Sequence, residues 1–220
     1  MVLTSNLRGL SLRLAPLGWS KAAASAGSLR VEATLGARPE VTAISLEAAG
    51  LQARGTVTLD ASGALQRASF SQVKVGNWMN APVDIIGRGR SAAPEIRVRG
   101  GMIDLRTANF GSDSAGGSGQ STGPLILSLD QLRITDTIAL TGMQGTFSTA
   151  KGLDGKFTGK INGGAAVAGR VVPQNGRSAV RITSQDAGGV VASAGIIQNA
   201  RGGDLNLTLL PVGQDGAFDG

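Results

Sequence analysis

Apolar and polar residues alternate along most of this chain, which is the pattern of half-buried β-strands. In residues 10–14, for example, Leu10, Leu12 and Leu14 share one face of the predicted strand, and Ser11 and Arg13 lie on the other. Each such run therefore predicts a strand with one apolar and one polar face. Clear further runs occupy residues 28–36, 50–60, 152–163 and 203–211.

Short segments rich in glycine, asparagine and aspartate separate these runs. Glycine adopts positive φ and Asn or Asp tolerates it, so "DASG", "INGG" and "PQNG" predict turns. Runs spaced by roughly 10–15 residues predict about a dozen strands joined as antiparallel meanders. No long helices separate the strands, as a parallel α/β sheet would require. We therefore expect a mainly β fold forming one continuous unit over residues 1–220.

The apolar face of such a sheet must be covered, and the pattern is compatible with two ways of doing so. Two sheets can close as a sandwich, or one long sheet can curl over its own apolar face and leave a groove. Small side chains suit both arrangements, so the alternation alone leaves the choice open.

The composition narrows the chemistry. The chain has 34 glycines, five phenylalanines, two tryptophans, and no tyrosine, histidine or cysteine. Without histidine and cysteine, it has neither the most common general base and metal ligand nor a thiol nucleophile. No pair of carboxylates and no Ser–Lys pair stands out instead. We therefore predict a protein that is not an enzyme, with no catalytic residue, metal or cofactor.

The net charge is +6, but the basic residues are scattered singly among the strands. Without a basic block or interleaved aromatic residues, the sequence does not favour nucleic-acid binding. The two tryptophans and four of the arginines each allow two interpretations. Trp19 and Trp78 are expected in core packing rather than at a membrane interface. A solvated strand face is favoured over contact with lipid phosphates for Arg88, Arg90, Arg97 and Arg99.

Two segments interrupt the alternation. Residues 111–123 are rich in glycine and serine and predict a flexible loop, with a domain boundary as the alternative. Residues 186–197 predict a short helix that begins near Asp186 as its N-cap and places Val190, Ala194 and Ile197 on one face. This helix is expected to plug one end of the sheet; the alternative is an amphipathic element that touches a membrane.

Around this helix the chain has a "DAG" start at residues 186–188, a short apolar helix, "N-x-R-G-G" at residues 199–203 and an alternating strand. This order of features resembles the C-terminal region of AsmA-like proteins of Gram-negative envelopes, the group of TamB and YhdP. Residues 50–76 and 80–106 are similar to the strand–turn–strand units of that family. The resemblance therefore covers most of the chain.

The resemblance implies a long, strongly curved antiparallel sheet, a groove or half-barrel, in a piece of a longer protein. It implies a periplasmic location, an inner-membrane anchor outside this chain, and phospholipid passing between the inner and outer membranes along the groove. The alternative is a structural or adhesion module with a closed, dry core. The residues expected to line the groove are Leu51, Val57, Leu59, Leu127, Leu129, Phe157, Leu205 and Leu207.

Overall fold

Strands make up most of the computed structural model, which describes residues 1–14, 17–34, 36, 40–108, 123–149, 152–174, 177–212 and 217–219. The first half contains β1 (Val2–Ser5), β2 (Leu12–Leu14), β3 (Trp19–Lys21), β4 (Gly27–Thr34), β5 (Glu40–Ala48), β6 (Leu51–Leu59), β7 (Leu65–Val75), β8 (Met79–Ile86), β9 (Glu95–Arg99) and β10 (Met102–Asp104). The second half contains β11 (Leu125–Arg133), β12 (Ala139–Ser148), β13 (Asp154–Ile161), β14 (Ala166–Gln174), β15 (Arg177–Ser184), α1 (Ala187–Ser193), β16 (Leu205–Val212) and β17 (Ala217–Asp219).

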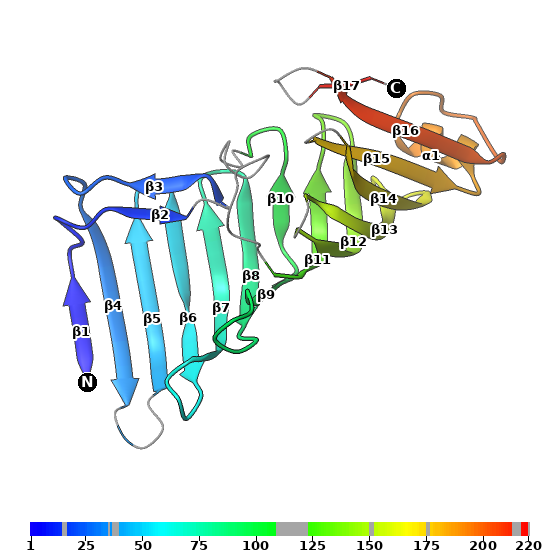
Figure 1. The fold of residues 1–220 in the computed structure, drawn as a ribbon. Coiled ribbons are helices and arrows are strands. Elements are labelled where there is room, and N and C mark those ends of the chain that lie inside the picture. The colour runs from blue at the N-terminus through cyan, green and yellow to red at the C-terminus, as the bar shows by residue number, and fades with distance from the viewer. Residues whose placement is uncertain are drawn as a thin grey trace.

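Fifteen of these strands form one long, curved sheet (Figure 1). Its order runs from β1 through β4–β8, β10 and β11–β16 to β17, with β9 also pairing β8 and β11. The sheet stays open, with β1 and β17 at its two edges. The predicted mainly β class, with one curved and mostly antiparallel sheet and one short helix, is confirmed. Strands are more numerous than predicted, because short ones such as β2, β3, β10 and β17 have only three residues.

One joint in the sheet is parallel, which the alternation did not predict. β9 and β10 run end to end along the same edge of β11, and both are parallel to it. On their other side, both pair antiparallel with β8. A parallel neighbour needs a crossover connection, and residues 105–124 provide it. The predicted Gly/Ser-rich loop, residues 111–123, belongs to this connection, and all of it except Gly123 lies outside the described part of the chain.

The sheet is a single layer. The described strands form this sheet and the two-stranded β2–β3 hairpin, so no second sheet of comparable size lies over the apolar face. The exposed surface is 13033 Å². A compact monomer of 22.1 kDa would expose about 9,300 Å². An open sheet contributes to this excess, because no second sheet of comparable size covers its apolar face.

One end of the strands is capped by two elements. The β2–β3 hairpin lies at the β5–β6 turn, where the indole Nε1 of Trp19 donates to the Ala49 carbonyl at 2.8 Å. The buried Lys21 holds this hairpin in place, since its ammonium donates to the carbonyls of Leu7, Leu10 and Ala22. α1 follows β15 at the same end of the strands. We call this end the capped end.

Phenylalanines lie opposite glycines across the sheet. Phe70 pairs with Gly55, Phe147 with Gly155, and Phe157 with both Gly145 and Gly169. A methyl group on Gly169 would lie 2.1 Å from the Phe157 ring, so the ring occupies the space that a side chain would fill. The glycines therefore let large side chains lie flat on the inner side of a strongly curved sheet.

The change Gly155→Ala should destabilise the fold by about 1–3 kcal/mol, because the added methyl group meets backbone as well as a ring. Its Cβ would lie 2.3 Å from the Thr146 carbonyl oxygen and 2.5 Å from Phe147 Cδ1. Gly36→Ala is the matched control, since a Cβ there meets nothing within 4 Å. Urea denaturation measures both variants. Equal midpoints would contradict the role assigned to this glycine.

Candidate functional site

Two continuous rows of apolar residues cross the sheet on one face. Cross-strand pairing places their members side by side from one strand to the next, and every position is a glycine or a hydrophobic residue. The central row is Leu3, Val31, Ile44, Gly55, Phe70, Val83, Val98, Leu127, Gly145, Phe157, Gly169, Ile182 and Leu207. The second row, farther from the capped end, is Ala33, Val41, Val57, Ala68, Ile85, Ile96, Leu125, Phe147, Gly155, Val171, Val180 and Leu209.

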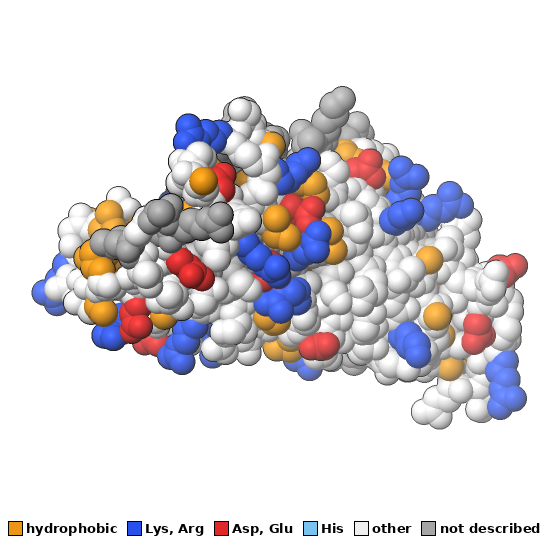
Figure 2. All heavy atoms as spheres, turned by 90° about the horizontal axis from the view of Figure 1, so that it is seen from below, with side chains coloured by type: hydrophobic (Ala, Val, Ile, Leu, Met, Phe, Trp, Pro, Cys, Tyr) orange, Lys and Arg blue, Asp and Glu red, His pale blue; other side chains and the backbone are white. Residues whose placement is uncertain are grey.

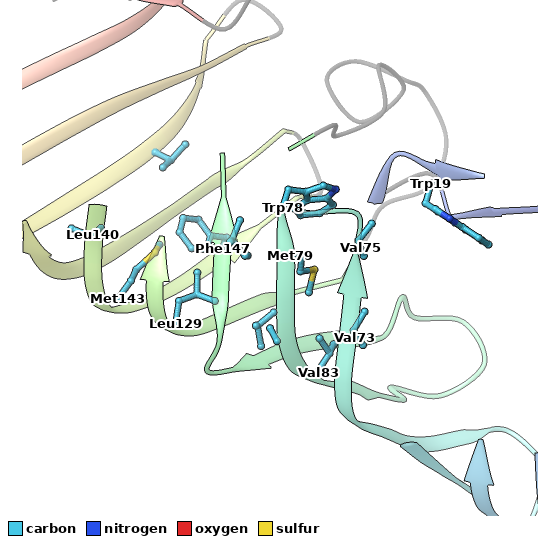
Figure 3. Close-up of a cluster of buried hydrophobic side chains, with 14 of the residues drawn as sticks. Trp19, Val73, Val75, Trp78, Met79, Val83, Leu129, Leu140, Met143 and Phe147 are labelled. Carbon is cyan, nitrogen blue, oxygen red and sulfur yellow. The ribbon is translucent and has the colours of Figure 1, made fainter. Parts of the chain in front are cut away.

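These rows are buried in the middle of the sheet and half-buried toward its edges. Val83 and Val98 are 7% and 5% exposed, whereas Leu3 on the edge strand is 49% exposed. Figure 3 shows Met79, Leu129, Met143 and Phe147 on the same side of the curved sheet, pointing to its inside. Curvature, rather than a second layer, thus covers the apolar face, and it covers it only in part.

The eight residues predicted to line a groove all lie on this apolar face, but not at equal depth. Leu127, Phe157 and Leu207 belong to the central row, and all three are half-buried. Leu51 and Leu129 are only 3% and 2% exposed, so they are packed core nearer the capped end. The remaining members, which are half-buried, are Val57, Leu59 and Leu205.

The sequence reasoning missed other members of the rows, such as Phe70, Val83 and Ile182, although they follow the same alternation. It also missed the glycines opposite the phenylalanines. Those glycines are recognisable only once the pairing register is known, because each partner comes from another strand.

Helix α1 covers the capped end beside the β13–β14 turn. Val190 and Ala194 pack against the buried cluster, as predicted from their spacing. Asn162 in that turn donates to the Ser193 carbonyl at 2.9 Å. The helix ends at Ser193, so the predicted extent to residue 197 is wrong: Gly195, with φ +75°, turns the chain. Ile197 consequently lies beyond the helix with 58% exposure.

The two motifs that flank the helix, "DAG" and "RGG", contact each other directly. The Asp186 carboxylate accepts from the amides of Gly189 at 2.8 Å and Gly202 at 3.0 Å. Gly188 lies so close to the Arg201 backbone that a Cβ would come within 2.1 Å of it. This contact closes the segment into a loop and fixes α1 against the sheet.

The opposite face of the sheet is polar. The row that lies between the two apolar rows on this face is Thr56, Ser69, Asp84, Arg97, Ile126, Thr146, Lys156, Arg170, Arg181 and Thr208. The two faces of one layer therefore differ sharply in polarity. Seen from below, toward the ends of the strands away from the capped end, hydrophobic side chains form small patches separated by charged and uncharged groups (Figure 2).

A hollow of about 490 Å³ lies on the polar face of β4–β7 and β9. Three arginines line it, and each already pairs with a carboxylate: Arg30 with Glu32, Arg54 with Glu47, and Arg99 with Asp84. Each of these arginines therefore already has a carboxylate partner, and Arg99 shares its partner Asp84 with Arg67.

Asp84 is the most buried charge on this face, with 1% exposure. Burial alone would raise its pKa, but the Ser69 hydroxyl at 2.7 Å, Arg67 at 2.5 Å and Arg99 at 2.9 Å stabilise the carboxylate more strongly. The pKa of Asp84 therefore lies below its usual value. This cluster ties β7, β8 and β9 together near the parallel joint.

Comparisons with protein families, with curated proteins and with solved structures identify no match for this chain. In the described part of the chain, no helix has the length and apolar character needed to cross a bilayer. The same residues contain no group of three side chains suited to hold a metal ion. The apolar face is therefore the main chemical feature from which a function can be argued.

The change Asp84→Asn should lower stability at neutral pH by about 1–3 kcal/mol, since hydrogen bonds to a charged group are lost. A depressed pKa stabilises the folded state above the ordinary value of 3.8, and this contribution is lost as the pH falls through the folded-state pKa. The variant should therefore lose less stability than the wild type on acidification. Thermal unfolding from pH 7 to pH 3 measures this, with the exposed Asp154→Asn as control. Parallel pH profiles would contradict the assignment.

Proposed function

We propose that this chain is a lipid-binding segment of a bacterial envelope protein, and that its apolar face shields phospholipid acyl chains from water. The headgroups would remain in solvent at the margin of the sheet. No chemical step is involved, and the role is passive binding and conduction along the row of strands. This proposal joins the resemblance to AsmA-like proteins with the arrangement of the sheet.

The observation that carries the proposal is the unbroken apolar character of the two rows. They extend across the sheet from β1 or β4 to β16 without a charged or hydrogen-bonding side chain. A core that served only stability would be covered by a second layer, yet the only other sheet in the described chain is the small β2–β3 hairpin. Large exposed apolar surfaces on soluble proteins generally mark a binding surface.

The lining also suits an acyl chain in its chemistry. Burial of a lipid chain contributes about 0.8 kcal/mol for each CH₂ group removed from water. Valine, leucine, isoleucine and glycine supply this contact without directional bonds. A chain held only by such contacts can slide from strand to strand, because no position binds it much more tightly than the next.

The competing interpretation is a structural or adhesion module with a closed, dry core. The half-buried state of residues such as Leu127, Phe157 and Ile182 argues against it, since a closed core would bury them. The sheet topology argues against it as well, since fifteen described strands form one open sheet. Lipid conduction therefore accounts for the open face better than a closed module does.

The location follows from the same proposal. A surface that carries lipid between two membranes belongs in the aqueous space between them, which in a Gram-negative cell is the periplasm. We propose that regions of the protein outside this chain anchor it to the inner membrane and approach the outer membrane, with the sheet as the connecting part.

The central test is the lipid content of the protein purified without detergent from a Gram-negative host. We expect organic extracts analysed by mass spectrometry to contain phospholipid. The change Leu127→Asn, which places a polar group in the central row, should reduce this amount several-fold. Ser128→Asn is the matched control, because the next residue of β11 faces the opposite side. Its lipid content should equal that of the wild type.

Circular dichroism and urea denaturation establish that both variants are folded before their lipid is compared. A folded wild-type protein without phospholipid would refute the lipid proposal. Equal lipid loss in both variants would show that binding does not occur on the apolar face. The outcome thus separates lipid binding in general from binding at this face.

A further inference from the structure

The hollow on the polar face of β4–β7 and β9 lies where the strand pairing is irregular on both sides of β6. On one side, two residues of β5, Thr42 and Ala43, lie opposite the single residue Thr56. On the other side, Ser71 of β7 is an extra residue in the β6–β7 register. Bulges of this kind bend a strand and redirect its side chains, and they are common beside binding sites.

The hollow combines small side chains with long basic ones. The lining residues with small side chains are Ala43, Ser45, Thr56, Ser69 and Ser71. The three lining arginines, Arg30, Arg54 and Arg99, come from β4, β6 and β9. Because these strands lie at different positions across the sheet, the guanidinium groups reach the hollow from different directions.

Positive charge exceeds negative charge around the hollow. Arg67 and Arg99 both pair with the Asp84 carboxylate, at 2.5 and 2.9 Å. The other two lining arginines each pair with one glutamate. Four arginines therefore share three carboxylates, and the remaining positive charge favours an anionic ligand.

The ion pairs leave hydrogen-bond donors on the lining arginines. Arg30 donates to Glu32, which also lines the hollow, through Nε and one terminal nitrogen. Arg54 donates to Glu47 through one terminal nitrogen. A guanidinium group has five N–H donors, so each of these arginines has further donors for a ligand. The carboxylates also restrict the arginine rotamers, which reduces the entropy lost on binding.

We propose that this hollow binds a phosphate group, either of a free phosphate compound or of a lipid headgroup. A phosphate group accepts hydrogen bonds through several oxygens around one centre, and guanidinium groups match the spacing of these oxygens. The hydroxyl groups of Ser45 and Thr56 add donors without adding charge. The inference does not rest on the binding of acyl chains, because the hollow lies on the face opposite the apolar rows.

Calorimetric titration with inorganic phosphate tests the site, with sodium chloride at the same ionic strength as the reference. We expect saturable binding to the wild type and about tenfold weaker binding to Arg54→Gln, which loses charge-assisted hydrogen bonds. Arg170→Gln is the matched control, because Arg170 is a similarly exposed arginine that pairs with one carboxylate on the same face, outside the hollow. Its affinity for phosphate should equal that of the wild type.

Ser45→Leu separates the shape of the hollow from its charge. The larger side chain fills part of the hollow and leaves every arginine in place, so the affinity for phosphate should fall although the net charge is unchanged. Leu127→Asn, on the apolar face, should bind phosphate as the wild type does, whatever its lipid content. A wild-type protein without saturable phosphate binding would overturn the proposal, and so would equal phosphate affinities of Arg54→Gln and Arg170→Gln.

Vesicles distinguish the two sources of the phosphate group. If the ligand is a lipid headgroup, sedimentation with vesicles of phosphatidylglycerol should carry down less Arg54→Gln than Arg170→Gln. Equal sedimentation of the two variants, together with weaker binding of inorganic phosphate by Arg54→Gln, assigns the site to a free phosphate compound. Both results support the hollow as a phosphate site. Circular dichroism establishes that the variants are folded before either measurement.

Discussion

The fold depends on one constraint, which is that a single β-sheet must cover most of its apolar face by its own curvature. Burial of the apolar rows supplies the driving force for folding, yet the only other sheet in the described chain is the small β2–β3 hairpin. The sheet therefore curves until side chains such as Val83, Val98 and Phe147 leave water. Glycine opposite phenylalanine makes that curvature sterically possible, since the ring takes the volume of the missing side chain.

The same constraint explains where the polar residues lie. Every second side chain faces outward, so the charges collect on the outer face, where Asp84, Arg67 and Arg99 can pair without disturbing the apolar rows. At the capped end, Trp19 and Val190 close the space that curvature alone leaves open. Stability and the proposed lipid binding thus use the same face. Its buried middle contributes to stability, and its half-buried remainder is the part proposed to bind lipid.

Alternation along the chain was sufficient to predict the longer strands and their two faces, and the N-cap and helical spacing predicted the helix near Asp186, because these features depend on neighbours in sequence. It did not predict the features that depend on which strands pair and in which register. The parallel placement of β11 beside β9 cannot be read from either strand, and the Phe157–Gly169 contact requires the register. The early end of α1 depends on the left-handed Gly195, which the helical spacing of Ile197 concealed. The lining residues were placed on the correct face, but their depth, as with Leu129, follows only from the curvature.

The parallel joint has a consequence for how the molecule forms. From β4 to β9 and from β11 to β15, consecutive strands pair with each other. Both halves of the sheet can therefore form through contacts between strands that are close in sequence. β11 can join β9 only after the long connection has been closed, a non-local step that costs chain entropy and is slow. During synthesis from the N-terminus, the first half of the sheet would therefore be complete before β11 pairs with β9 and β10. The connection between β10 and β11 is also the place where the chain could be divided into two parts that are made separately and then associate.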